Sequence, residues 1–253
     1  MIKNRDARWH AFDSAIYELH NYGILREDDA WILERMVEFH SGLPAGARVV
    51  DVGTGPNLMP LLVPLRRSQS IAVWEYSLSN ISWLASTLLK GRLQHNWQQV
   101  WDRIRNLTED HDSSPDVIDE MRSRIRLHQA SIFDLPQGQW DVATMEFCAE
   151  SITSNPDEFV AACVAFAGCI KDDGSVFAAF MEGSEGYTVG DVQYPAVRVD
   201  AARLQRVFAP LLVELDVARV PDGASRLRSG YTGMLVLTGK GRRRGGDGGR
   251  EHD

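Results

Sequence analysis

The sequence predicts an α/β protein with a mostly parallel sheet flanked by helices on both faces. Apolar, β-branched runs alternate with helical patterns from Val49 to Met181, and this alternation is typical of parallel sheets. The first run ends in Gly53-Thr54-Gly55, a tight turn that leads from a buried strand into a helix. The last two apolar runs are separated only by residues 221–230, which favours a C-terminal antiparallel hairpin.

Two helices are expected before the first strand. Phe12, Ile16 and Leu19 follow a helical spacing, which predicts a helix over 9–22. A second stripe that contains Trp31 and Met36 predicts a helix over 28–40. Residues 1–46 are therefore interpreted as an N-terminal helical lid.

The core is expected at 47–239, with seven strands among its helices. The strand-forming runs lie between breakers at 48–52, 70–75, 126–130, 140–147, 175–181, 211–220 and 231–238. Helical spacing and capping residues such as Ser77 predict helices at 56–66, 77–90, 93–107, 115–124, 157–170 and 200–208. The helices at about 91–124 form an insertion between the second and third strands. Residues 171–174 are expected to form a turn before the fifth strand.

Composition excludes several classes of protein. The 253 residues are 44% hydrophobic, enough for one large folded domain, and the net charge of −8 argues against nucleic acid as a partner. No apolar run approaches the roughly 20 residues of a membrane span. Three cysteines without a Cys-x-x-Cys pair and scattered histidines argue against a metal site. We expect a cytoplasmic monomer whose residues 240–253, rich in Arg and Gly, form a disordered tail.

The turn after the first strand predicts an adenosine-containing ligand. Gly53 and Gly55 allow the backbone to approach a ligand closely at a helix start, although a dinucleotide fingerprint would have glycine in place of Leu58. Glu75 ends the second strand, twenty residues after Gly55, where a carboxylate can accept hydrogen bonds from both ribose hydroxyls. The residue pair Ser131-Ile132 follows the third strand and is expected to contact the purine.

Five segments of the chain resemble one enzyme family. The chain is similar to class I S-adenosylmethionine-dependent methyltransferases, and within them to the group of nicotinamide, phenylethanolamine and indolethylamine N-methyltransferases. The similarity extends from about Phe12 to Lys240. The segments that carry it are Phe12-Asp-Ser-Ala-Ile-Tyr-Glu-Leu-His-Asn-Tyr22, Val50-Asp-Val-Gly-Thr-Gly-Pro56, Glu75-Tyr76-Ser77 with Asn80, Asn96-Trp97, and Gly186-Tyr187-Thr-Val-Gly190.

The resemblance implies a Rossmann-like class I methyltransferase fold, with S-adenosylmethionine as the cofactor. It also implies that Tyr17 and Tyr22 close over that cofactor, and that Ser131 occupies the usual position of an adenine-binding aspartate. The residues expected to bind the cofactor are Tyr17, Tyr22, Asp51, Gly53, Thr54, Gly55, Glu75, Tyr76, Asn80, Ser131, Ile132 and Glu146.

The acceptor is expected to be a small molecule that presents an amine or an aromatic nitrogen. Glu150, Glu182 and Tyr187 follow the fourth and fifth strands, where carboxylates can bind an ammonium group or accept its proton, and we select them as catalytic candidates. The alternative for any one glutamate is a solvated loop residue. Three other functions stay open: O-methylation, a lyase or cyclase reaction that uses the same cofactor, and a non-catalytic binding module. An NAD-linked reductase is the weakest alternative.

Overall fold

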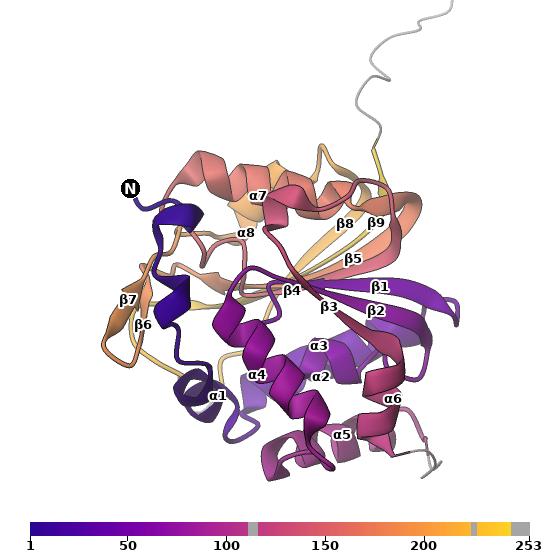
Figure 1. Cartoon of the computed structure of the whole chain (residues 1–253). Coiled ribbons are helices and arrows are strands. Elements are labelled where there is room, and N and C mark those ends of the chain that lie inside the picture. The colour runs from indigo at the N-terminus through magenta and orange to yellow at the C-terminus, as the bar shows by residue number, and fades with distance from the viewer. Residues whose placement is uncertain (111–115, 224–226, 244–253) are drawn as a thin grey trace, which may run out of the picture.

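A seven-stranded sheet forms the centre of the protein (Figure 1). The structure is a computed structural model that describes residues 1–110, 116–223 and 227–243. The strand order is β3-β2-β1-β4-β5-β9-β8, in which β1 to β5 run parallel while β9 is antiparallel to both β5 and β8. The strands are β1 Ala47–Val52, β2 Ser68–Glu75, β3 Ile125–Gln129, β4 Trp140–Glu146, β5 Ile170–Glu182, β8 Leu212–Arg219 and β9 Gly233–Arg242. This sheet confirms the predicted fold class and the C-terminal hairpin.

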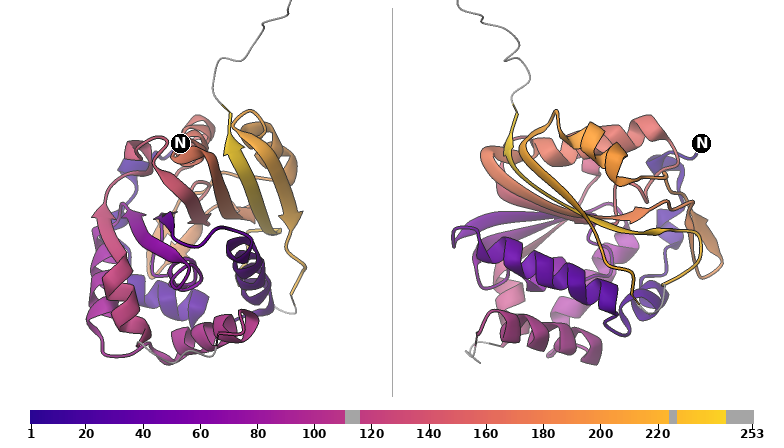
Figure 2. Two further views of the ribbon diagram at one scale, coloured as in Figure 1. Left: turned by 90° about the vertical axis from the view of Figure 1, so that its right-hand side faces the viewer. Right: turned by 180° about the vertical axis from the view of Figure 1, so that it is seen from behind.

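Helices cover both faces of the sheet (Figures 1 and 2). On one face lie α2 Glu27–Ser41, α3 Met59–Leu62, α4 Leu78–Leu89, α5 His95–Leu107 and α6 Val117–Arg124. On the other lie α7 Pro156–Gly168 and α8 Ala201–Phe208. Because strand side chains alternate, Phe177 and Ala179 face the first group, whereas Val176 and Ala178 face the second. Two apolar cores therefore hold the sheet rigid between its helical layers.

Two expectations around the sheet were wrong. The helix expected at 56–66 is only the four-residue α3. Pro64 has no backbone N–H with which to continue the helical hydrogen bonds after Val63, although Val63 itself still has helical φ and ψ angles. Residues 171–174, expected to form a turn, belong to β5. A register shift against β4 accommodates them there, and Lys171 Nζ lies 2.5 Å from Asp141 Oδ1.

A small hairpin that was not predicted from the sequence follows β5. It consists of β6 Tyr187–Val189 and β7 Val192–Tyr194, which pair antiparallel. Its turn is Gly190-Asp191, and Gly190 has a φ of +56°, a backbone conformation that favours glycine. A Gly-Asp pair between two valines is a hairpin signal that could have been recognised.

The N-terminal segment crosses the carboxyl ends of the strands before its helix begins. Short 3₁₀ turns at Asn4–Asp6 and Trp9–Ala11 precede α1 Ser14–Tyr22, so the helix expected from residue 9 starts later. Asp13 sets this start by accepting hydrogen bonds from the backbone N–H groups of Ala15 and Ile16, at 3.1 and 2.9 Å. The backbone N–H of Asn4 donates to Glu158 Oε2 at 2.9 Å, which fixes the beginning of the segment beside α7.

The C-terminal strand extends into the segment expected to be a tail. Residues 240–242 belong to β9, and residues 244–253 lie outside the described part of the chain. Within the described ranges, no helix combines the length and apolar character that a membrane crossing requires.

Candidate active site

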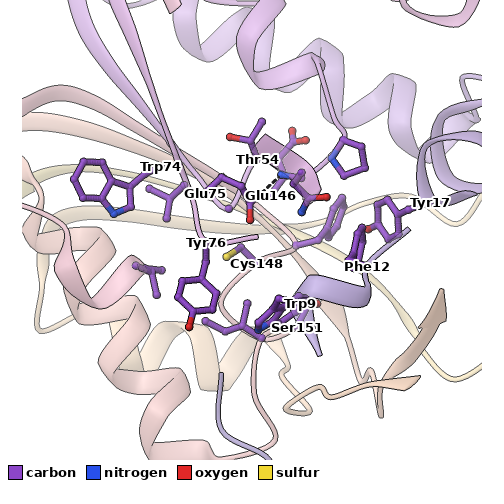
Figure 3. Close-up of a pocket in the computed structure, with 18 of the residues that line it drawn as sticks. Trp9, Phe12, Tyr17, Thr54, Trp74, Glu75, Tyr76, Glu146, Cys148 and Ser151 are labelled. Atoms are coloured by element: carbon purple, nitrogen blue, oxygen red, sulfur yellow. Dashed lines mark hydrogen bonds between the residues drawn. The ribbon is translucent and has the colours of Figure 1, made fainter. Parts of the chain in front are cut away.

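A cavity with about 690 Å³ of empty space, part of it open to solvent, lies at the carboxyl ends of β1, β2 and β4. Figure 3 shows Thr54, Glu75 and Glu146 approaching it from the strand ends, while Trp9 and Tyr17 approach from the N-terminal segment. Ten of the predicted cofactor-binding residues line this cavity: Tyr17, Tyr22, Gly53, Thr54, Gly55, Glu75, Tyr76, Asn80, Ile132 and Glu146.

The glycine turn presents bare backbone to this cavity. Gly53 and Gly55 have φ values of +68° and +59°, a region that side chains disfavour. A Cβ atom on Gly53 would lie 2.2 Å from the Sγ of Cys148. The residue at position 53 must therefore be glycine for conformational and steric reasons together.

Asp51 lies behind the turn and does not belong to the lining of the cavity. Its Oδ2 accepts a hydrogen bond from the hydroxyl of Thr54, and its Oδ1 accepts one from the hydroxyl of Thr144, both at 2.5 Å. Burial raises the pKa of Asp51 to about 7. The structure thus gives Asp51 a positioning role in the turn, where the sequence had predicted direct contact with the cofactor. Thr144 was missed, because only the strand order places it beside Asp51.

Glu75 joins the glycine turn to the end of β2. Its Oε2 accepts the backbone N–H of Gly55 at 2.8 Å, and its Oε1 accepts that of Ser77 at 2.7 Å. Burial raises the pKa of this carboxyl group, against the effect of those hydrogen bonds. Each carboxylate oxygen can accept a further bond, so hydroxyl groups of a ligand in the cavity can bind here as well.

Glu146 places a second carboxyl group at the cavity, at the end of β4. Its Oε2 accepts a hydrogen bond from Asn57 Nδ2 at 2.5 Å, whereas its Oε1 is buried and has no hydrogen-bond partner among the described residues. Burial, reinforced by the nearby charge of Asp51, raises the pKa of Glu146 to about 8. A buried carboxyl oxygen without a donor fits a cationic group of a ligand, which would supply the missing partner.

Ser131 does not contact the cavity, unlike its neighbour Ile132. The hydroxyl of Ser131 accepts the backbone N–H of Phe133 at 3.3 Å, and its carbonyl oxygen accepts the indole N–H of Trp74 at 2.8 Å. It therefore caps the short 3₁₀ turn Ile132–Asp134, and of the predicted pair only Ile132 lines the cavity.

Aromatic side chains from distant parts of the chain form the roof. The rings of Trp9 and Tyr194 stack at 5.1 Å between centroids, and those of Tyr187 and Tyr194 at 5.3 Å. Phe12 lies 5.1 Å from Tyr17, between centroids. Trp9 and Phe12 also line the cavity, although neither was predicted as a site residue.

A second cavity, with about 680 Å³ of empty space that is also partly open to solvent, adjoins the first. Five residues line both of them: Tyr17, Tyr22, Phe147, Ser151 and Tyr187. The second cavity adds Asp29, whose Oδ2 lies 2.6 Å from Arg26 Nη2, and Arg228 on the opposite loop. Burial raises the pKa of Asp29 to about 7, although the charge of Arg26 opposes the shift. None of these three charged residues was predicted from the sequence.

The predicted catalytic candidates are not brought together. Tyr187 lies at the junction of the two cavities, but neither glutamate is part of their linings. Glu150 is fully buried and its Oε1 accepts the backbone N–H of Met181 at 2.9 Å, while burial raises its pKa to about 7. Glu182 forms an ion pair with Arg219, with 3.1 Å between Oε2 and Nε. In the structure Glu182 is therefore an ion-pair partner on the sheet and lies outside the linings of both cavities.

The sheet order and the cavity at its glycine turn define a class I methyltransferase of the S-adenosylmethionine-dependent type. A family model described as the NNMT/PNMT/TEMT family matches residues 24–237. The chain belongs to this family, as the resemblance predicted, and S-adenosylmethionine is its cofactor. A search of curated protein sequences found no significant match.

Solved structures agree on the fold at low sequence identity. DhpI in complex with S-adenosylhomocysteine has a TM-score of 0.57 at 14% identity, covering 91% of this chain and 92% of its own. The 1,6-didemethyltoxoflavin-N1-methyltransferase of Burkholderia thailandensis has a TM-score of 0.51 at 14% identity, with 85% and 79% covered. The N-methyltransferase NodS of Bradyrhizobium japonicum has a TM-score of 0.52 at 9% identity, with 92% and 95% covered.

Proposed function

We propose that this methyltransferase methylates a nitrogen atom of a small acceptor molecule bound in the second cavity. The observation that carries the proposal is the junction of the two cavities, where Tyr17, Tyr22 and Tyr187 belong to both linings. A cofactor in the first cavity and an acceptor in the second would meet at these rings. The names of NodS and the toxoflavin enzyme, both N-methyltransferases, support nitrogen as the acceptor atom.

The first cavity would bind the cofactor through its two carboxyl groups. S-adenosylmethionine supplies a methyl group already activated on a sulfonium. Glu75 would accept hydrogen bonds from the ribose hydroxyls, and the free Oε1 of Glu146 would accept the ammonium of the methionine part. Ile132 and Tyr76 would border the adenine, and Asn80 lies beside Glu75 in the lining.

The residues of the junction would position the acceptor and exclude water. Methyl transfer needs an unprotonated lone pair aligned with the methyl group, so orientation contributes most of the rate. The aromatic faces of Tyr17, Tyr22 and Tyr187 can hold a flat or cationic acceptor. Asp29, with its pKa raised to about 7, is a carboxyl group of the second cavity that can accept a proton or orient an N–H group near neutral pH.

Product analysis tests this function. The protein is incubated with S-adenosylmethionine and panels of amines, N-heteroaromatics and phenols, and the nucleoside products are separated. S-adenosylhomocysteine together with an N-methylated product supports the proposal. Methylation of phenols alone would favour an O-methyltransferase. Release of 5′-methylthioadenosine would favour a lyase or cyclase reaction.

A further inference from the structure

The second cavity holds a guanidinium that forms no ion pair with a carboxylate in the part of the chain that the structure describes. Four ionisable side chains other than tyrosine line it: His20, Arg26, Asp29 and Arg228. Arg26 is engaged by Asp29 at 2.6 Å and by Asp28 at 3.6 Å, so that guanidinium is already paired. Arg228, by contrast, forms no ion pair with any carboxylate in the described ranges.

The guanidinium of Arg228 is fixed in position by neutral partners. Its Nη1 donates to the carbonyl oxygen of Gly186 at 2.6 Å, and its Nη2 donates to the hydroxyl of Ser184 at 3.0 Å. Its Cζ lies 5.6 Å from the ring centroids of both Tyr187 and Tyr231. A guanidinium has five N–H donors, so these two bonds leave donors available for a ligand. Cation–π contacts and backbone bonds orient the side chain without cancelling its charge.

The remaining walls of the cavity favour a flat, largely apolar body beside that charge. Tyr17, Tyr22 and Tyr187 contribute aromatic surface, and Met181, Leu227 and Met234 contribute aliphatic surface. Tyr187 belongs to both cavities and lies directly under the guanidinium. An aromatic ring held against Tyr187 would therefore have one edge facing the first cavity and another edge facing Arg228.

We propose that the acceptor is an aromatic or heteroaromatic nitrogen compound that carries a carboxylate, and that Arg228 binds this carboxylate. The inference rests on the proposed N-methyltransferase function and specifies its substrate class. A guanidinium can bind a carboxylate through two parallel N–H···O bonds, which would fix the ring orientation as well as the charge. A simple cationic amine would instead be repelled by Arg228.

Matched acid and amide probes test the inference. Pyridine-3-carboxylate is compared with pyridine-3-carboxamide, and 4-(aminomethyl)benzoate with 4-(aminomethyl)benzamide, because each pair differs little except in charge. The affinity of each probe for the protein saturated with S-adenosylhomocysteine is measured by calorimetry. In separate reactions with S-adenosylmethionine, the formation of S-adenosylhomocysteine is measured for each probe. We expect the acid of at least one pair to bind more tightly and to react with the higher kcat/KM. Equal or better binding of both amides, or no binding of either acid, overturns the inference.

Variants separate substrate binding from a merely structural role of Arg228. In Arg228→Gln, KM for the preferred acid should rise roughly 10–100-fold, as expected for loss of a charged hydrogen-bonding partner, while cofactor affinity stays near that of the parent. Arg228→Lys keeps the charge and should recover part of the preference for acids over amides. Arg126→Gln is the control, since Arg126 is exposed and also bonds to backbone carbonyls, those of Arg122 and Ile125.

The outcomes distinguish this inference from the proposed function. If Arg228→Gln retains the parent's ratio of acid to amide affinity, Arg228 does not bind the carboxylate, even when methylation occurs. If the parent binds acids through Arg228 but forms no S-adenosylhomocysteine with any acceptor, the methyl-transfer proposal fails and the anion site stands.

Discussion

The carboxylate of Glu18 accepts a hydrogen bond from the indole Nε1 of Trp97 at 2.7 Å. A second indole, that of Trp83, donates to the other oxygen of Glu18 at 3.2 Å. Because Glu18 lies on α1, Trp83 on α4 and Trp97 on α5, these bonds tie three separate helices together. Tyr22 packs on Trp97 with 5.4 Å between ring centroids, so the hydrogen-bonded cluster around Glu18 also supports a tyrosine that lines both cavities.

Glu18→Ala should loosen the roof of both cavities. The substitution leaves two buried or half-buried indole N–H groups without their acceptor, which costs about 1–3 kcal/mol of unfolding free energy for each buried group left unsatisfied. We expect a lower denaturation midpoint and weaker S-adenosylmethionine binding, measured by chemical unfolding and calorimetry. Glu38→Ala is the control, because the Glu38 side chain is 66% exposed. If Glu18→Ala binds S-adenosylmethionine as tightly as the parent, the hydrogen bonds of Glu18 do not support the first cavity.

Gly53→Ala should destabilise the protein more than Gly46→Ala. Both glycines have positive φ, +68° and +83°, so alanine is strained at either by about 1–2 kcal/mol. Only at position 53 would the new Cβ collide with a neighbour, at 2.2 Å from Cys148 Sγ, which adds an overpacking cost of about 1–3 kcal/mol. Urea denaturation of the two variants measures the difference. Equal losses of stability would show that the turn can move away from Cys148.

The stability of the cofactor-free protein should fall as pH rises from about 5 to 8. Burial raises the folded-state pKa of Glu146 to about 8, above the value of an exposed glutamate, so its stabilising contribution is complete at low pH and is lost as pH rises through 8. Asp51 and Glu150, with pKa values raised to about 7, act in the same direction.

Glu146→Gln should reduce this slope, because the amide does not ionise. The slope that one group contributes cannot exceed about 1.4 kcal/mol per pH unit. Denaturant midpoints between pH 5 and 9 provide the measurement, with the exposed Glu214→Gln as a control. A slope identical to that of the parent would show that Glu146 already ionises in the folded protein at low pH.

Glu182→Gln should leave turnover within roughly twofold of the parent. Glu182 is paired with Arg219 outside both cavities, and the two side chains are 19% and 46% exposed. An ion pair this accessible contributes less than about 1 kcal/mol to stability. Steady-state kinetics with any acceptor that the parent methylates is the test, and a tenfold fall in kcat would restore Glu182 as a substrate residue.

The central part of the fold and half of the site were predictable because they depend on local sequence. The glycine turn and Glu75 follow directly from strands whose patterns are continuous in the chain. The position of Glu182 was not predictable. Its partner Arg219 lies on β8, and the pair forms across Gly233 of β9, where a Cβ would meet Arg219 Nη2 at 2.7 Å. Only the strand order β5-β9-β8, with a glycine between the two charges, brings them together.

The second cavity could not be predicted for a similar reason. Asp29 lies on α2 and Arg228 on a loop before β9, almost two hundred residues apart, and neither belongs to a sequence motif. Tyr194 was missed because the hairpin β6–β7 to which it belongs was not predicted. Contacts between distant segments form the second cavity, whereas local sequence forms the glycine turn and places Glu75 at the first cavity.

Calorimetric titration of S-adenosylmethionine into the parent and into Glu75→Ala tests the assignment of the first cavity most directly. We expect saturable binding to the parent and a loss of affinity of roughly 10–100-fold in the variant, because in our proposal Glu75 would supply charged acceptors to the ribose hydroxyls. Thermal unfolding of both proteins checks that the variant is folded. Equal affinity for parent and variant, or no binding to the parent, would contradict the placement of the cofactor in this cavity.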